Sequence, residues 1–159
     1  MPATIHASAV LVGARAVLIR GPSGAGKSRL ALELIEAGRR GGIAFARLVG
    51  DDRVHVEAAA GRLLVHPAPA LAGLIELRGL GILRQDHEDC AVVGLVVDLD
   101  AEDGQRLPEL REAIVEGIKL PRVPVAPGAA ALPAVLAMLA PAGPAGSLSG
   151  IGKAGLAID

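Results

Sequence analysis

The chain has 159 residues and a formal net charge of −1 at pH 7, with 16 Lys and Arg against 17 Asp and Glu. This length predicts one compact domain, and the balanced charge excludes the electrostatic footprint of a nucleic-acid-binding protein. Hydrophobic residues make up 52% of the chain, but Phe45 is its one aromatic residue. We therefore expect a core of Ala, Val, Leu and Ile, without stacking platforms for single strands.

Cys90 is the single cysteine, so an internal disulfide is excluded and a reducing cytoplasm is expected. We interpret Cys90 as a small buried hydrophobic residue. Residues 1–10 lack the basic region of a secretory signal. The apolar segment 129–147 is interrupted by prolines, whereas a membrane-spanning helix needs about 20 predominantly apolar residues. Neither a membrane nor a nucleic acid is therefore expected as a partner.

The first elements predicted along the chain are two adjacent strands at 9–13 and 16–20, with His6 just before the first. The second strand leads directly into the glycine-rich segment 21–28. The next residues, 28–38, carry apolar side chains at helical spacing and end in a glycine that predicts the end of the helix.

Short apolar runs dominate the middle of the chain. Residues 43–50 form one run, and 53–58 with 62–67 alternate in polarity around an Ala-Gly pair, which predicts a hairpin. Residues 67–73 predict a loop or a single turn. The run at 90–100 predicts the clearest buried strand, since it is continuously apolar and closed by carboxylates.

The last third predicts two strands within 109–125 that turn at Gly117, followed by a helix at 129–140. Gly, Ala, Pro and Ser dominate the remainder. The predicted organisation is a single kinase-type domain at 1–140 and a mobile tail at 141–159.

Residues 21–28, GPSGAGKS, match the phosphate-binding pattern G-x-x-x-x-G-K-[ST]. Its glycines let backbone N–H groups point at phosphate oxygens, and the following helix adds its positive end. Lys27 is suited to neutralise the β- and γ-phosphates of ATP, and the Ser28 hydroxyl to bind Mg²⁺. The predicted nucleotide-binding residues are Gly21, Pro22, Ser23, Gly24, Ala25, Gly26, Lys27 and Ser28.

Two strand ends compete to supply the acidic residue that such a site needs near the metal. Asp98 closes the apolar run LVVDLD, and Asp51 and Asp52 close LVGDD. Carboxylates at the carboxyl ends of strands lie where open α/β sheets bind their ligands. Spacing alone leaves both alternatives open.

A longer motif resembles one family. The segment IELRGLGI (75–82), together with GPSGAGKS and VGDDRV in this order, resembles the catalytic domain of HPr kinase/phosphorylase, which phosphorylates a serine of the phosphocarrier protein HPr. The resemblance covers about residues 4–128 and is to a short form without the family's N-terminal domain. It implies an α/β phosphate-loop domain with a central mixed sheet flanked by helices, of the HPr kinase and PEP carboxykinase type.

The resemblance also implies roles for individual residues. Asp52 corresponds to the base that accepts the proton of the HPr serine, and it would act as the acid in the reverse direction. Glu76 joins Ser28 as a Mg²⁺ ligand, and Lys27 holds phosphate. These roles form a coherent set for phosphoryl transfer.

Further residues follow from the same resemblance. His6 matches the family's active-site histidine, and Arg106 matches its catalytic arginine. Asp98 is then left with a structural role. Ala129 and Ala130 stand where the family tends to carry Arg-Asn, a pair used for dephosphorylation, so the kinase direction is better supported than the phosphorylase direction.

The implied function is a cytoplasmic, Mg-ATP-dependent serine kinase of HPr or a paralogue that regulates the phosphotransferase system, assembled as a homo-oligomer, hexameric in the family. One alternative is a small-molecule phosphate-loop kinase, although the basic cluster at Arg39 and Arg40 is short for the lid of such an enzyme. The other alternative is a regulator that senses nucleotide without catalysis.

Overall fold

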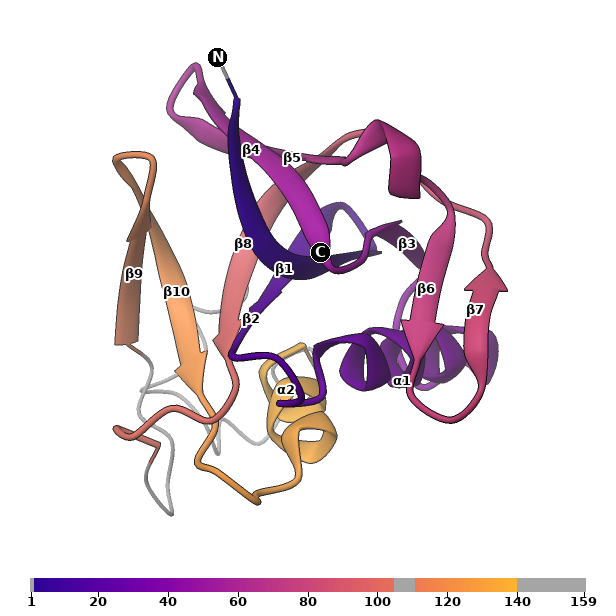
Figure 1. Ribbon diagram of the computed structural model, residues 1–159. Helices are drawn as coiled ribbons and strands as arrows, with labels where there is room; N and C mark the ends of the chain where they lie inside the picture. Colours follow the sequence, from indigo (N-terminus) through magenta and orange to yellow (C-terminus); the bar gives the residue numbers. More distant parts are fainter. Residues whose placement is uncertain (1, 105–110, 140–159) are drawn as a thin grey trace.

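The computed structural model describes residues 2–104 and 111–139 (Figure 1). Strands and two helices follow one another as the sequence predicts for an α/β domain. In chain order they are β1 (Ala3–Val12), β2 (Arg15–Arg20), α1 (Lys27–Arg39), β3 (Ala46–Gly50), β4 (Arg53–Ala59), β5 (Arg62–Pro67), a 3-10 turn (Pro69–Leu71), β6 (Leu74–Leu77), β7 (Gly81–Arg84), β8 (Ala91–Asp98), β9 (Arg111–Val115), β10 (Ile118–Pro124) and α2 (Ala131–Leu139).

Eight strands form one hydrogen-bonded sheet in the order β2-β1-β4-β5-β8-β10-β9, with β3 also paired to β1 and β2 also paired to β8. Strand β1 pairs with β4 over Ala3–His6 and with β3 over Ala9–Val12. Strand β8 changes partner in the same way, from β5 to β2. These changes of partner fold the sheet into two layers. The sheet is mixed, since β2 and β10 run parallel to β8 while the other pairings are antiparallel, and the predicted fold class is confirmed.

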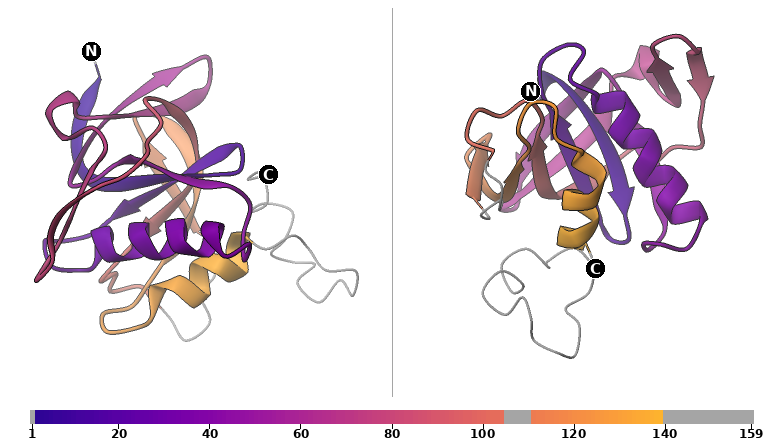
Figure 2. Two further views of the ribbon diagram at one scale, coloured as in Figure 1. Left: turned by 90° about the vertical axis from the view of Figure 1, so that its right-hand side faces the viewer. Right: turned by 90° about the horizontal axis from the view of Figure 1, so that it is seen from below.

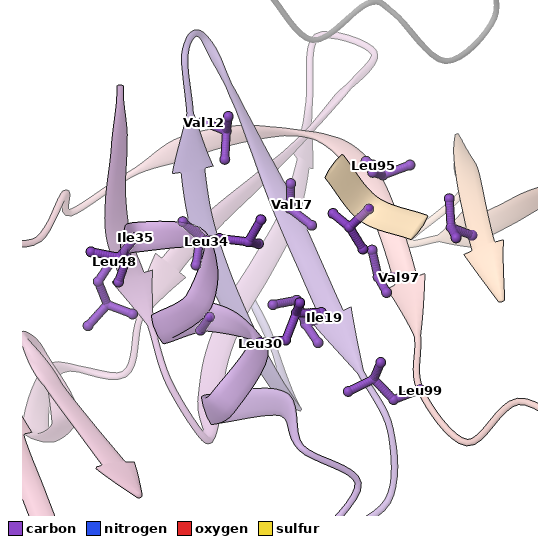
Figure 3. Packing of buried hydrophobic residues seen from close by; sticks show 14 of the residues in the cluster. Val12, Val17, Ile19, Leu30, Leu34, Ile35, Leu48, Leu95, Val97 and Leu99 are labelled. Atoms are coloured by element: carbon purple, nitrogen blue, oxygen red, sulfur yellow. The ribbon is translucent and has the colours of Figure 1, made fainter. Parts of the chain in front are cut away.

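Helices α1 and α2 cover the same face of the sheet (Figure 2). Leu30 and Leu34 of α1 and Val135 of α2 pack in one cluster with Ile19, Val97 and other residues of the sheet (Figure 3). A second cluster, which contains Leu18 and Val65, fills the space between the two strand layers. The buried hydrophobic side chains are all Ala, Val, Leu or Ile, as expected.

Local turn signals identified several elements correctly. The hairpin β4–β5 turns at Ala60-Gly61, where both residues have positive φ, and β9–β10 turns at Glu116-Gly117 in the same way. Two boundaries were wrong. His6 lies inside β1, because the strand extends back to Ala3 to pair with β4. Gly38 lies inside α1, where a side chain would collide with Ala46, and the chain turns instead at a glycine three residues later.

The interpretation of Cys90 as buried was also wrong. This residue precedes β8 and is exposed, since the buried part of the apolar run begins one residue later. The pKa of the Cys90 thiol is raised, mainly because the thiol is partly buried and to a smaller extent because of the negative charge of Glu57. The predicted tail at 141–159 lies outside the described residues. Within the part of the chain that is described, no helix is long and apolar enough to span a membrane.

Candidate active site

The segment 21–28 connects the end of β2 to the first turn of α1, which is the arrangement a phosphate-binding loop requires. Gly24 and Gly26 have φ of 84° and 101°, a backbone conformation that glycine adopts without steric strain. Gly26 is the N-cap of α1 and makes no side-chain capping bond, and the first turn of the helix has no acidic residue. The N–H groups at this helix end therefore remain available to an anion.

The Lys27 side chain folds back over the same loop. Its ammonium group donates hydrogen bonds to the carbonyl oxygens of Gly21 at 2.8 Å and Pro22 at 3.2 Å. The ammonium group consequently lies beside the loop backbone that would surround a phosphate. This position is suited to a contact with phosphate oxygens.

Asp51 is the buried centre of a polar group that we call the Asp51 cluster, formed by Ser8, Ser28, Asp51 and Glu76. The Ser8 hydroxyl donates to Asp51 Oδ1 at 2.5 Å, and the backbone N–H of Glu76 donates to Oδ2 at 3.1 Å. The Ser28 hydroxyl lies 2.7 Å from Oδ1 and 2.8 Å from Oδ2. Asp51 is only 2% exposed, so a buried carboxylate is held by donors from three separate segments.

Both residues of the predicted metal site thus contact Asp51, Ser28 through its hydroxyl and Glu76 through its backbone N–H. Ser28 is the second residue of α1. Glu76 lies in β6, where its backbone N–H bonds to Asp51 and its side chain is exposed. Ile75 anchors this strand in the core beneath α1. Hydroxyl and carboxylate oxygens are the hard ligands that Mg²⁺ prefers. The described residues contain no group of three or more His, Cys, Asp or Glu able to hold a metal, so water and phosphate oxygens would complete the coordination.

Asp52 and His6 lie next to each other at the adjacent sheet end. Asp52 connects β3 to β4, is exposed, and has a φ of 67°. Its carbonyl oxygen accepts a hydrogen bond from the N–H of Ala7 at 3.2 Å. His6 is exposed and pairs in register with Arg53, the residue after Asp52. The backbones of two of the predicted catalytic residues are therefore adjacent at this end of the sheet, next to Asp51.

Asp98 occupies a different environment from the aspartates at 51 and 52. Arg20 donates to both Asp98 oxygens at 2.7 and 2.8 Å, and Arg122 donates to Oδ2 at 2.5 Å. Burial raises the pKa of Asp98, but the hydrogen bonds and charges of the two arginines outweigh it and hold the pKa below its ordinary value. This carboxylate ties β2, β8 and β10 together, whereas the Ser28 hydroxyl hydrogen-bonds to Asp51.

Sequence reasoning named Asp51 among the competing carboxylates without a role of its own, and Asp51 is the one that contacts Ser28. Sequence reasoning missed two features of the site, Ser8, which supports Asp51, and Arg78. The guanidinium group of Arg78 lies against the glycine loop, 3.4 Å from the place that a Cβ atom would take if Gly24 carried a side chain. The available signal for Ser8 was a polar residue directly before the apolar run 9–13. Arg106 lies outside the described residues.

The fold and the site have the features of the phosphate-loop class of α/β proteins: a strand, a glycine loop and a helix on a mixed sheet, with a carboxylate beside the loop serine. Residues 2–88 match the family described as HPr Serine kinase C-terminal domain. The chain belongs to this family.

Individual relatives agree with this assignment. The HPr kinase/phosphorylase of Streptococcus thermophilus is 36% identical over 133 residues, which cover 76% of this chain and 41% of that protein. For the Streptococcus sanguinis protein the identity is 33%, with coverage of 76% and 40%. The solved structure of the Hpr(Ser) kinase/phosphatase from Coxiella burnetii has a TM-score of 0.69 at 25% identity, covering 86% of this chain and 93% of that one. The chain thus spans about two fifths of the length of these curated relatives.

Proposed function

We propose that this chain is a Mg-ATP-dependent serine kinase that phosphorylates HPr or a paralogous phosphocarrier protein of the phosphotransferase system in the cytoplasm. One observation carries the proposal: the Asp51 cluster joins the serine of the phosphate loop to Glu76 of the family motif. A generic phosphate loop accounts for Ser28 but not for the motif beside it. Membership of the HPr serine kinase family supports the same acceptor.

The described residues fit the nucleotide and the metal that this function requires. The N–H groups of residues 21–28 and the Lys27 ammonium group would hold the phosphates, and Ser28 with Glu76 would hold Mg²⁺. Bound Mg²⁺ would neutralise charge on the transferred phosphoryl group. Arg78, which lies against Gly24, adds a further positive charge at the loop.

Asp52 is proposed as the base. Its exposed carboxylate would accept the proton of the acceptor serine as the serine oxygen bonds to the γ-phosphorus. The bond from the γ-phosphorus to the β,γ-bridging oxygen breaks, and ADP leaves with that electron pair. His6, whose strand position is opposite Arg53, the residue after Asp52, is proposed as the active-site histidine that the family resemblance implies. Arg106 is proposed as the arginine that stabilises the charge of the transition state.

The experiment is incubation of the protein with Mg-ATP and purified HPr, followed by detection of phosphoserine. HPr whose acceptor serine is replaced by alanine is the substrate control. Lys27→Ala should lower the rate by about 100-fold or more, because a charged contact to the transferred group is lost. Lys119→Ala removes an exposed lysine of β10 and should leave the rate unchanged, which makes it the matched control.

The results separate the alternatives. Turnover of a metabolite without modification of HPr would favour a small-molecule kinase, and tight ATP binding without any transfer would favour a nucleotide sensor. Addition of inorganic phosphate to phosphorylated HPr tests the reverse direction. There an oxygen of the phosphate would attack the phosphorus of the phosphoserine, the bond from that phosphorus to the serine oxygen would break, and Asp52 would return a proton to the serine oxygen, which releases pyrophosphate and HPr. We expect this reaction to be the weaker of the two because Ala129 and Ala130 replace Arg-Asn.

We also propose that the chain forms a homo-oligomer. Leu80, Ile82 and Ile114 are 75%, 66% and 66% exposed, which is unusual for side chains of this size. Sedimentation at micromolar concentration tests this. A monomer would contradict the proposal without affecting the assigned chemistry.

A further inference from the structure

We infer that Ser8 is a positioning residue that orients Asp51 toward Ser28 and thereby sets the metal affinity of the site. The inference rests on the magnesium site of the proposed function. Ser8 belongs to no motif of the sequence, and its hydroxyl hydrogen-bonds to Asp51. Its influence would pass through the Asp51 carboxylate.

The burial of Ser8 is the first observation. Ser8 and Asp51 are the buried polar or charged residues of the described chain, at 0% and 2% exposure, and they are bonded to each other. Alternate residues of β1 share a face, and Val10 and Val12, on the Ser8 face, lie in the core beneath the helices. An aliphatic side chain would therefore be expected at position 8 on this face of β1. A buried hydroxyl there is stable only because it has a partner.

The position of Ser8 in the sheet is the second observation. Strand β1 leaves β4 after His6 and joins β3 at Ala9, so Ser8 faces the short connection between β3 and β4. The N–H of Ala7 holds the backbone of this connection through the Asp52 carbonyl. Ser8 holds its side chain through Asp51 Oδ1. The two adjacent contacts fix both the path of the connection and the rotation of the carboxylate.

The consequence concerns the Ser28 hydroxyl. Ser8 occupies Asp51 Oδ1 and the Glu76 N–H occupies Oδ2, so the plane of the carboxylate is fixed from two sides. Ser28 faces both oxygens at 2.7 and 2.8 Å and gives its one proton to them. The oxygen lone pairs of Ser28 are then free for a cation. Without Ser8, the carboxylate can rotate, and the Ser28 hydroxyl loses its fixed orientation.

The test is binding of Mn²⁺, a paramagnetic substitute for Mg²⁺, in the presence of saturating ADP, measured by electron paramagnetic resonance. Ser8→Ala should weaken Mn²⁺ binding about tenfold, equivalent to about 1.4 kcal/mol and to the loss of one hydrogen bond to a charged group. Ser8→Cys keeps a weak donor of similar size and should give an intermediate affinity, which also decides the question if Ser8→Ala does not fold. In the kinase assay, Ser8→Ala should raise the Mg²⁺ concentration for half-maximal rate and leave the rate at saturating Mg²⁺ unchanged.

Val10→Ala is the matched control, because it removes buried volume from the same face of the same strand. It should lower the urea midpoint and leave Mn²⁺ affinity unchanged. Mn²⁺ affinities within twofold of wild type in both Ser8 variants, equal weakening in Val10→Ala, or a wild type that binds no Mn²⁺ with ADP would each overturn the inference. If the Ser8 series behaves as expected but HPr is not phosphorylated, the proposed function fails alone.

Discussion

Asp51 and Asp52 are adjacent in sequence, but substitution by asparagine should mainly lower stability at the first and mainly lower activity at the second. In Asp51→Asn, the amide oxygen can keep the Glu76 N–H, but its NH₂ group then faces Ser8, whose hydroxyl has to change from donor to acceptor. Bonds to a charged group become bonds to a neutral one at a site that is 2% exposed. We expect a loss of about 2 kcal/mol of unfolding free energy and a fall in Tm of about 4–8 °C.

Asp52→Asn should leave stability nearly unchanged. The side chain is exposed, and asparagine tolerates the φ of 67° as readily as aspartate does. The change in unfolding free energy should stay within about 0.5 kcal/mol. The rate of phosphoryl transfer to HPr should nevertheless fall about 10²- to 10⁴-fold, because the base is lost.

Urea unfolding and the HPr assay, run on both variants and the wild type, give the comparison. Asp51→Asn should be the unstable variant, with an increased Mg²⁺ requirement, and Asp52→Asn the stable and inactive one. Equal stability of the two variants would refute the division into a buried and an exposed carboxylate. Wild-type transfer by Asp52→Asn would refute its assignment as the base.

Three further predictions concern the rest of the domain. The two arginines lower the pKa of Asp98, so Asp98 contributes stability at any pH above its ordinary pKa of 3.8. This stability is lost as the pH falls through the lowered pKa of the folded state. Acid titration of stability should therefore be steeper in wild type than in Asp98→Asn, and equal slopes would contradict the ion-pair geometry. Leu34→Ala should lower the unfolding free energy by about 2–5 kcal/mol in urea, and a loss below about 1 kcal/mol would mean that the site collapses around the cavity. Alkylation of the exposed Cys90 by iodoacetamide should still accelerate above pH 9.0, because its pKa is raised, and a plateau below that pH would indicate an activated thiol.

Elements that depend on neighbouring residues could be predicted from the sequence. The loop 21–28 carries its own geometry in its glycines, and the strand before it and the helix after it followed from hydrophobic periodicity. The turns at Gly61 and Gly117 were identifiable because glycine supports positive φ between two strands. The aliphatic core followed directly from composition.

Features that depend on distant pairing could not be predicted in this way. Nothing local in β1 indicates that it changes partner after His6, so the length of the strand and the position of His6 were misjudged. The choice between Asp51 and Asp98 as the carboxylate beside Ser28 depends on which strand end faces α1. Cys90 was misjudged because a continuous apolar run does not show where burial begins.

One face of β1 connects the core to the site. His6 is exposed beside Asp52, Ser8 is buried on Asp51, and Val10 lies in the core beneath α1, all two residues apart on the same face. A slip of one residue in the register of β1 would turn all three to the opposite face and replace them with apolar neighbours, two of which are Ala7 and Ala9. The register that buries Val10 therefore also places Ser8 and His6, so the hydrophobic register that stabilises the fold is the same one that assembles the candidate active site.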